Sequence, residues 1–434
     1  MKLRYVFSAP AMLRLQPNKW AVDNPDEYEG ITKIINEGLQ KIKKSLYVNK
    51  DVIDEFEVDI LFNAYTENNV GEFIRMNDNF GFSKLFADSG GLQMITQGKT
   101  VTHEIKSEIY NVQKIADIAM CFDVIPVEKF KGVTVARSRV TDKVYDPNKA
   151  AYCAKETALN IKNQIDSLID STSKVSYIIQ GNNYQDMVEW FDVGVTELGP
   201  ELINNIAGLS LADTCIGNGE KESIDMLVAY HLLNKKYGRD IIKDHVHLLG
   251  VGSSSRLKPL FYLSKNGFLN NDTTFSFDST TISMSIIQGK YENENGAINS
   301  DNLIEIRKEL IDSLEFYSDI MKKYFDNFDI EYIADHMISN IKSTADMINK
   351  ADNIHYQSII RAMVPLLCFK RLLYFSKRID NIIKSVDSDP SPMGMLRYVK
   401  DMDDFKRWND DFGRYMQSKR IYRHGNNLDN LFGE

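Results

Sequence analysis

Short apolar runs recur along the chain, and each is about as long as one buried strand. Within each run, apolar or β-branched residues follow one another without helical spacing, which is typical of strands that are buried on both faces. The runs occupy residues 3–7, 58–62, 84–87, 118–122, 175–179, 202–209, 246–250 and 274–277.

Longer segments between these runs place their apolar residues at helical spacing. In residues 28–46, for example, Ile31, Ile35 and Ile42 fall on one face of a helix. Strands that alternate with helices favour a parallel sheet, and closure into a (β/α)8 barrel is the most economical arrangement. We therefore predict an α/β fold of the TIM-barrel type for residues 1–299. The other candidate helices occupy residues 103–115, 149–169, 185–195, 221–236 and 256–265.

The strand signals stop before the C-terminal part of the chain. Ser300 can cap a helix whose apolar positions include Leu303 and Ile306. Residues 387–394 are expected to form a loop, because Ser, Asp, Pro and Gly dominate them. We predict that residues 300–434 form an α-helical C-terminal region. Its further helical patterns cover residues 331–349, 355–377 and 395–420.

Composition limits the classes of protein that fit. The chain has 434 residues, 43% of them apolar, so it can bury a large core. Its formal net charge is −9, so affinity for nucleic acid would need a local basic patch. The cysteines show no CxxC spacing, which favours a reducing compartment. No stretch approaches the roughly 18 apolar residues that span a bilayer, and Arg4 and Arg14 interrupt any signal segment. We expect a soluble cytoplasmic protein with no membrane partner.

The most distinctive polar cluster is Phe-Ala-Asp-Ser-Gly-Gly-Leu-Gln at residues 86–93, directly after a predicted strand. Gly90 and Gly91 would let backbone N–H groups approach a flat polar ligand, and Asp88 could accept or donate a proton. The alternative is a tight strand-to-helix turn in which Asp88 caps the helix.

Five further clusters follow at predicted strand ends. The carboxyl ends of parallel strands meet at one mouth of a barrel, which is where the active site of such a barrel lies. The clusters are Met-Cys-Phe-Asp at residues 120–123, Ile-Ile-Gln-Gly at 178–181, Ile-Ala-Gly-Leu at 206–209, Leu-Leu-Gly-Val-Gly at 248–252 and Phe-Ser-Phe-Asp at 275–278.

Taken in this order, the six clusters resemble the signatures of the queuine/archaeosine-type guanine transglycosylases. That family has Asp-Ser-Gly-Gly-aromatic-Gln, Phe-Asp, Gln-Gly, Gly-Leu, Gly-Val-Gly and Phe-Asp motifs, and it exchanges a guanine in nucleic acid for a 7-deazaguanine. The resemblance covers about residues 61–288. It implies a barrel enzyme without a cofactor that takes a free 7-deazaguanine base as its second substrate.

The resemblance places the catalytic nucleophile on Asp278 and the general acid/base on Asp88. Exchange must break the C1′–N9 bond while keeping the sugar from water, and a carboxylate can trap the sugar as a glycosyl ester. Two carboxylates at one cavity should also raise one another's proton affinity, which suits one of them to acid/base work. For Asp278, an Asx turn or a helix cap is the alternative.

Base recognition follows from the same resemblance. Asp123 would accept the N1–H and the exocyclic amine of a guanine-like base, which rejects adenine. Gln180 and the backbone of Gly208 and Leu209 would hold the side of the base that carries O6 and the 7-substituent, and a structural buried amide is the alternative for Gln180. The residues expected to bind the base are Ser89, Gly90, Gly91, Leu92, Asp123, Gln180, Gly208 and Leu209.

Two segments are candidates for binding nucleic-acid phosphates. The first is Ser253, Ser254, Ser255 and Arg256, which could hold phosphates at a helix N-terminus, with a tight strand exit as the alternative. The second lies in the C-terminal region, where Lys and Arg outnumber Asp, and a solvated helical face is its alternative. Its basic residues are Lys370, Arg371, Lys377, Arg378, Lys406, Arg407, Lys419, Arg420 and Arg423.

The chain departs from the family in ways that bear on its partner. Leu92 stands where the family has a stacking aromatic residue, so Phe122 or Met94 would supply that contact. The family's Cys-x-Cys-x-x-Cys…His zinc site is missing, because Cys368 is the only cysteine after Cys215, and we expect no metal site. In the family, this zinc element binds tRNA. Because it is missing here, the chain is more similar to the DNA-guanine transglycosylases of phages and genomic islands than to the tRNA enzymes.

The sequence therefore predicts exchange of guanine in DNA for a base such as 7-cyano-7-deazaguanine, in the host cytoplasm if a phage encodes the protein. Exchange in tRNA is the first alternative. A metal-dependent barrel hydrolase is the second, because His245 and His247 would share a face of a strand, although both precede its carboxyl end. A non-catalytic binding subunit is the third, and the presence of both Asp88 and Asp278 argues against it.

Overall fold

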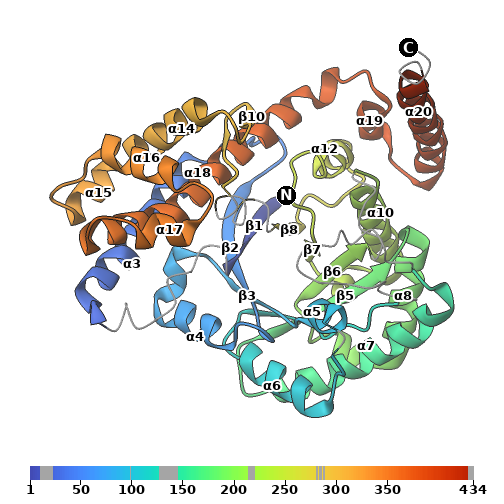
Figure 1. Cartoon of the computed structure of the whole chain (residues 1–434). Helices are drawn as coiled ribbons and strands as arrows, with labels where there is room; N and C mark the ends of the chain where they lie inside the picture. Colours follow the sequence, from blue (N-terminus) through green and yellow to red (C-terminus); the bar gives the residue numbers. More distant parts are fainter. Residues whose placement is uncertain are drawn as a thin grey trace.

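Eight parallel strands close into a barrel in which each strand pairs with its neighbours in chain order. The structure is a computed structural model, and it describes residues 1–9, 23–97, 99–126, 145–213, 220–279, 282, 286 and 289–428. The predicted TIM-type α/β fold is confirmed (Figure 1). The strands are β1 (Lys2–Ser8), β2 (Glu55–Asn63), β3 (Leu85–Asp88), β4 (Ile118–Met120), β5 (Lys174–Gly181), β6 (Gly208–Asp213), β7 (His245–Leu248) and β8 (Thr274–Ser279).

Helices connect successive strands and cover the outside of the barrel, as the alternating pattern predicts. Local signals fix several of their ends: the Asn183 side chain accepts a hydrogen bond from Asp186 N at the start of α8, and Gly199 ends this helix at a φ of 76°. The helices are α3 (Pro25–Ser45), α4 (Asn68–Met76), η1 (Asp78–Gly81), α5 (Gly91–Thr96), α6 (His103–Gln113), α7 (Pro147–Leu168), α8 (Tyr184–Leu198), α9 (Pro200–Ile203), α10 (Glu220–Tyr237), α11 (Arg239–Ile242) and α12 (Lys258–Lys265).

The C-terminal region is helical, as predicted, and follows a small hairpin of β9 (Glu292–Asn293) and β10 (Gly296–Ala297). Figure 1 shows α14 to α17 grouped beside α3 on one side of the barrel, while α20 lies apart from them, beyond α12. Within the described ranges, no helix combines the length and the apolar character that crossing a membrane requires. The region comprises α14 (Leu303–Phe316), α15 (Ser318–Tyr324), α16 (Ile330–Ser339), α17 (Thr344–Asn349), α18 (Ile354–Ser385), η3 (Val386–Ser388), α19 (Pro392–Met395), η4 (Leu396–Tyr398) and α20 (Met402–Leu428).

The long helix α18 joins the C-terminal region to the barrel through a shared apolar core. Phe375 packs against the rings of Tyr5 and Phe277, which point outward from β1 and β8. Leu366 lies against α3 so closely that a Cβ on Gly38 would be 2.1 Å from its Cδ2. The helical region therefore covers strands of the barrel rather than standing apart from them.

Several predicted boundaries were wrong. The cap of α14 is Asn302 rather than Ser300, because the Asn302 side chain accepts a hydrogen bond from Glu305 N. The helix predicted to end at residue 377 continues to Ser385.

The run at residues 202–209 is not one strand, because Pro200 starts the short helix α9 and β6 begins only at Gly208. The pattern at residues 331–349 forms two helices, since α17 starts anew with Ser343 as its cap. The segment 387–394, expected to be a loop, contains most of η3 and most of α19, and the last helix begins only at Met402.

The barrel interior is filled with polar as well as apolar side chains. On β5, Tyr177 points outward, since a Cβ on Gly194 of α8 would be 1.7 Å from its hydroxyl. Its neighbour Ser176 points inward and hydrogen-bonds Ser210 of β6, with 2.7 Å between the two Oγ atoms. This alternation places every second residue of a strand on the barrel axis. The inward-facing residues at the carboxyl ends of the strands contribute to the candidate site.

Candidate active site

Three carboxylates gather where the strands end. Asp88 is the last residue of β3, Asp278 lies next to the end of β8, and Asp123 follows β4. Because all eight strands run in parallel, these residues lie at the same mouth of the barrel. Burial raises the pKa of Asp88 to about 7, and the charges of Asp123 and Asp278 add to the increase. An acid with a pKa near neutrality can both donate and accept a proton.

Asn63, at the end of β2, fixes the orientation of the Asp88 carboxylate. Its Nδ2 donates a hydrogen bond to Asp88 Oδ2 at 3.0 Å. Its Oδ1 accepts hydrogen bonds from the backbone N of Tyr65 and of Thr66, each at 3.0 Å, which determines how the amide is turned. Sequence reasoning missed Asn63. The available signal was a polar residue that directly follows an apolar strand run.

The two glycines after Asp88 allow the loop to turn tightly beside Asp123. Gly90 has a φ of 74°, and a Cβ there would be 2.5 Å from the Cβ of Tyr65. A Cβ on Gly91 would lie 3.5 Å from Asp123 Oδ1, so the start of α5 faces that carboxylate. Asp88 also accepts hydrogen bonds from the backbone of Ser89 and Gly90. The turn and the catalytic interpretations of Asp88 are therefore compatible.

The residues considered for stacking have different surroundings. Leu92 is half-buried in α5, and Met94 is buried in the same helix. Phe122 is buried beside Asp123, and Lys106 Nζ lies 5.5 Å from the centroid of its ring. One face of the Phe122 ring is thus covered by an ammonium group. A stacking role for these residues stays a prediction.

Asp123 and Gln180 form a buried pair across β4 and β5. Gln180 Nε2 donates to Asp123 Oδ2 at 2.6 Å, and the side chains of both residues are almost completely buried. A hydrogen bond of this kind to a charged group is stronger than one between neutral partners. Together with the position of Gly91, it fixes the plane of the Asp123 carboxylate beside the Asp88 loop.

Asp278 is held by donors from the strand next to it. Gly250 N donates to Asp278 Oδ1 at 2.8 Å, and His247 Nε2 lies 3.2 Å from the same oxygen. Burial acts to raise the pKa of Asp278, but the His247 and Gly250 hydrogen bonds outweigh it and lower the pKa below its ordinary value. The side chain retains 23% exposure, so it opens onto the mouth. Asp88 and Asp278 thus have pKa values displaced in opposite directions.

Gly208 and Leu209 do not lie at the mouth, which corrects their predicted position. They begin β6, where Gly208 pairs with Ser176, whereas Gln180 pairs with Ala212. A separation of four residues places Gly208 roughly 13 Å deeper along the strand, at about 3.3 Å per residue. The glycine is needed for a different reason, because a Cβ there would be 2.2 Å from the carbonyl oxygen of His245. At the level of Gln180, β6 instead presents Ala212.

The serine-rich segment after β7 lies close to Asp278. The hydroxyl groups of Ser253 and Ser255 are 3.0 Å apart, and Ser253 Oγ accepts a hydrogen bond from Arg256 N. The Arg256 side chain donates to Gly250 O at 3.2 Å. Since the N–H of Gly250 holds Asp278, the segment that includes Ser254 borders the mouth. Binding of phosphates there stays a prediction.

Most of the C-terminal basic residues have other partners. Lys370 and Arg371 are buried, and Arg371 Nε lies 3.1 Å from Glu292 of β9. The predicted phosphate-binding surface is therefore not supported by these two residues. The other described members pair with acidic residues of the chain: Lys377 with Glu294, Arg378 with Glu292, Lys406 with Asp403 and Arg407 with Asp404. Lys419, Arg420 and Arg423 lie outside the described side chains.

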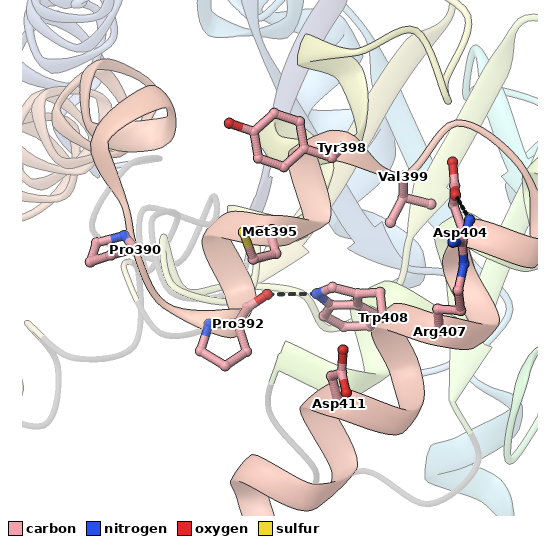
Figure 2. Close-up of a pocket in the computed structure, with 9 residues that line it drawn as sticks. All are labelled: Pro390, Pro392, Met395, Tyr398, Val399, Asp404, Arg407, Trp408 and Asp411. Atoms are coloured by element: carbon pink, nitrogen blue, oxygen red, sulfur yellow. Dashed lines mark hydrogen bonds and ion pairs between the residues drawn. The ribbon is translucent and has the colours of Figure 1, made fainter.

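A second hollow lies among the C-terminal helices and is separate from the barrel mouth. Figure 2 shows it between α19, η4 and the start of α20, with the Trp408 ring at its base. Trp408 Nε1 donates to Pro392 O at 2.6 Å, and the ring stacks on Phe412. The hydrogen bond joins α20 to α19, whereas the stacking of the two rings lies within α20. The hollow is lined by Pro390, Pro392, Met395, Tyr398, Val399, Asp404, Arg407, Trp408 and Asp411.

The described residues do not form a metal site. Among them, no group of three or more His, Cys, Asp or Glu side chains is arranged to hold an ion. His245 and His247 share a face, as their alternation predicts, but both hydrogen-bond Ser276. Cys368 is buried in α18, and Cys215 lies outside the described residues. This geometry does not favour the metal-dependent hydrolase.

Comparison with known proteins found no matching family model and no matching curated protein.

Proposed function

We propose that the protein is a DNA-guanine transglycosylase that exchanges a guanine in DNA for a 7-deazaguanine through a covalent bond between the sugar and Asp278. The observation that carries this proposal is the pair of carboxylates at one barrel mouth with oppositely displaced pKa values, about 7 for Asp88 and below the ordinary value for Asp278. Separated pKa values of this kind assign one group to acid/base work and the other to nucleophilic attack.

In the first half of the exchange, a side-chain oxygen of Asp278 attacks C1′ of the target nucleotide. The C1′–N9 bond breaks, its electron pair goes to the departing guanine, and Asp88 donates a proton to that base. His247 and Gly250 both donate to Oδ1 of Asp278, so Oδ2 is the oxygen that we expect to attack. The product is a glycosyl ester with an ionised Asp88.

In the second half, the incoming 7-deazaguanine takes the place of guanine. Asp88 removes the proton from N9 of this base, and N9 attacks C1′ on the face that guanine has left. The bond between C1′ and the Asp278 oxygen breaks, and its electron pair restores the carboxylate. Asp88 and Asp278 return to their starting protonation states, so no other reactant is needed.

The Asp123–Gln180 pair supports a base that carries hydrogen-bond donors. A buried carboxylate favours the N1–H and exocyclic amine of a guanine-like base, because adenine would leave it without matching donors. The target guanine must leave the duplex to reach Asp278 at the mouth. DNA is proposed over tRNA because the chain resembles the phage and genomic-island enzymes and lacks the cysteines of the tRNA-type zinc site. Exchange in tRNA stays the alternative.

The direct test is to incubate the purified protein with duplex DNA and labelled 7-cyano-7-deazaguanine, with tRNA in a parallel reaction. We expect label in DNA, measured by nucleoside mass spectrometry, and a DNA–protein adduct that survives denaturation. Asp278→Asn should abolish both signals. Asp272→Asn, an exposed aspartate just before the opposite end of β8, is the matched control and should keep them. Label that enters only tRNA would reassign the substrate, and exchange by Asp278→Asn would refute the proposed nucleophile.

A further inference from the structure

A chain of hydrogen bonds runs from Asp278 into the interior of the barrel. His247 Nε2 lies 3.2 Å from Asp278 Oδ1, and His247 Nδ1 lies 2.8 Å from Ser276 Oγ. Ser276 Oγ also lies 2.8 Å from His245 Nε2. His247 and Ser276 are fully buried. This series of hydrogen bonds links β7 to β8 and ends on Asp278, the proposed nucleophile.

The direction of these bonds follows from the carboxylate. An ionised Asp278 can only accept, so His247 must carry a proton on Nε2. In a neutral His247, Nδ1 then accepts from the Ser276 hydroxyl, and Ser276 in turn accepts from His245 Nε2–H. Every donor points toward Asp278, and bonds aligned in this way strengthen one another in a low-dielectric interior.

His245 suits the far end of the chain because it stays neutral. Burial lowers its pKa well below the ordinary value, with further contributions from the charges of His247, Lys84 and Arg4. A neutral imidazole can offer either a donor or an acceptor at Nε2, depending on its tautomer. If His247 gained a second proton, the Ser276 hydroxyl could therefore rotate and donate to His245 instead. The same atom positions accommodate both charge states of His247.

Packing holds the two imidazole rings in place from the opposite side of the barrel. The Phe86 ring of β3 lies 5.9 Å from the ring of His247 and 6.0 Å from that of His245, measured between centroids. Phe86 precedes Asp88 by two residues, so the strand that carries the acid/base also positions the histidines beneath the nucleophile. A ring held on one side by Phe86 and at Nδ1 by Ser276 has little freedom to turn.

We propose that His247, oriented by Ser276 and His245, is the positioning residue of Asp278 and makes this carboxylate a good leaving group in the second half of the exchange. This inference rests on the proposed function. A donor that stabilises the carboxylate more than its ester favours breakage of the C1′–O bond. Loss of the donor should therefore slow the transfer of the sugar to the incoming base more than it slows formation of the ester.

The test compares His247→Phe with His247→Gln and Ser276→Ala, with Ser210→Ala as a matched control. Ser210 is also a buried serine on the barrel axis, but it bonds Ser176 on the other side. For each variant, the adduct with DNA is trapped before and after addition of 7-cyano-7-deazaguanine. In His247→Phe we expect the adduct to persist and the second step to slow by about tenfold to a hundredfold, as for loss of a hydrogen bond to a charged group. His247→Gln, which can still donate, should recover part of this loss.

The pH profile separates positioning from a general structural effect. The groups that interact with Asp278 are His247 on β7, Asp88 on β3 and Tyr5 on β1. Loss of the His247 donor removes a contribution that lowers the Asp278 pKa, so the acidic limb of the single-turnover rate should move to higher pH. Ser276→Ala should move it in the same direction by less, which keeps the test informative if His247→Phe does not fold.

The outcomes distinguish the inference from the function on which it rests. If the wild-type protein forms no adduct with DNA or tRNA, the proposed function is wrong. If the wild-type protein exchanges bases but His247→Phe and Ser276→Ala match Ser210→Ala in adduct lifetime and pH profile, only the positioning role is wrong. A His247→Phe protein in which both half-reactions slow equally would also overturn it.

Discussion

Asn63 donates its side-chain amide to Asp88 at 3.0 Å, so the last residue of β2 orients the last residue of β3. The same two residues are partners in the strand register. The contact makes the orientation of Asp88, the proposed general acid/base, dependent on a residue that carries no charge. It also gives a way to change the pKa of Asp88 without removing the carboxylate.

Asn63→Asp should move the alkaline limb of the exchange reaction to higher pH. The substitution adds a fourth carboxylate to the mouth, directly beside Asp88, and like charges raise one another's proton affinity. The first half-reaction needs a protonated Asp88, so the rate of the wild-type protein should fall as the pH rises, with a midpoint near pH 7. The rate of the variant should fall with a midpoint at a higher pH. Single-turnover rates from pH 5 to pH 9 would show the shift. Asn49→Asp, in the loop before the opposite end of β2, should leave the midpoint unchanged.

Asp88→Asn should abolish exchange and stabilise the fold at high pH. Because burial raises the pKa of Asp88 to about 7, its contribution to stability is complete below its ordinary pKa and is lost as the pH rises through 7. Ionised Asp88 therefore costs on the order of 4 kcal/mol at pH 8, because its pKa is displaced by roughly three units at about 1.4 kcal/mol per unit. Urea denaturation should show a more stable variant at pH 8 and little difference at pH 4.

Asp278→Asn is the control for that measurement, because we expect it to change the stability at pH 8 in the opposite direction. Its carboxylate has a lowered pKa, because the His247 and Gly250 hydrogen bonds outweigh burial, so its contribution to stability is present above the ordinary pKa and is lost in acid. The variant should therefore lose stability at pH 8, where Asp88→Asn gains it. Equal responses of the two variants would contradict the opposite displacement of the two pKa values.

The barrel could be predicted because its signals are local. Apolar runs alternate with amphipathic segments, and seven of the eight predicted strands overlap a single observed strand along most of their length. The run at residues 202–209 failed because Leu202 and Ile203 are apolar in a short helix that Pro200 starts. An apolar run alone does not separate a buried strand from a buried helical turn.

The site residues were predictable only where the local sequence around a single residue indicates its position. Asp88, Asp123 and Asp278 each follow a strand run, and the parallel strands bring them to one mouth. The roles of Asn63 and Ser276 depend on which residues face each other across strands, and no local pattern specifies that register. Gly208 was placed at the mouth for a different reason: the predicted strand ended at residue 209, whereas Gly208 opens β6 at the other end.

Asp123→Asn should weaken binding of the incoming base more than it slows chemistry. The Gln180 amide already donates to Asp123 Oδ2, so an asparagine would bring a second amide into a site that needs an acceptor for the N1–H and amine of the base. We expect the KM for 7-cyano-7-deazaguanine to rise by about tenfold to a hundredfold, as for loss of a hydrogen bond to a charged group. A lower kcat with an unchanged KM would assign Asp123 to catalysis instead.

Gly90→Ala should disturb the site through the backbone alone. Gly90 has a φ of 74°, and a Cβ would meet Tyr65 at 2.5 Å and Asn63 Oδ1 at 2.8 Å, so the loop must move away from the residue that orients Asp88. Gly267→Ala is the matched control, because its φ is also 74° but nothing lies within 4 Å of the added Cβ. Both should lose roughly 1 kcal/mol or more of stability from backbone strain. Only Gly90→Ala should also lower the exchange rate at pH 7, and equal rates in the two variants would mean that the loop does not set the position of Asp88.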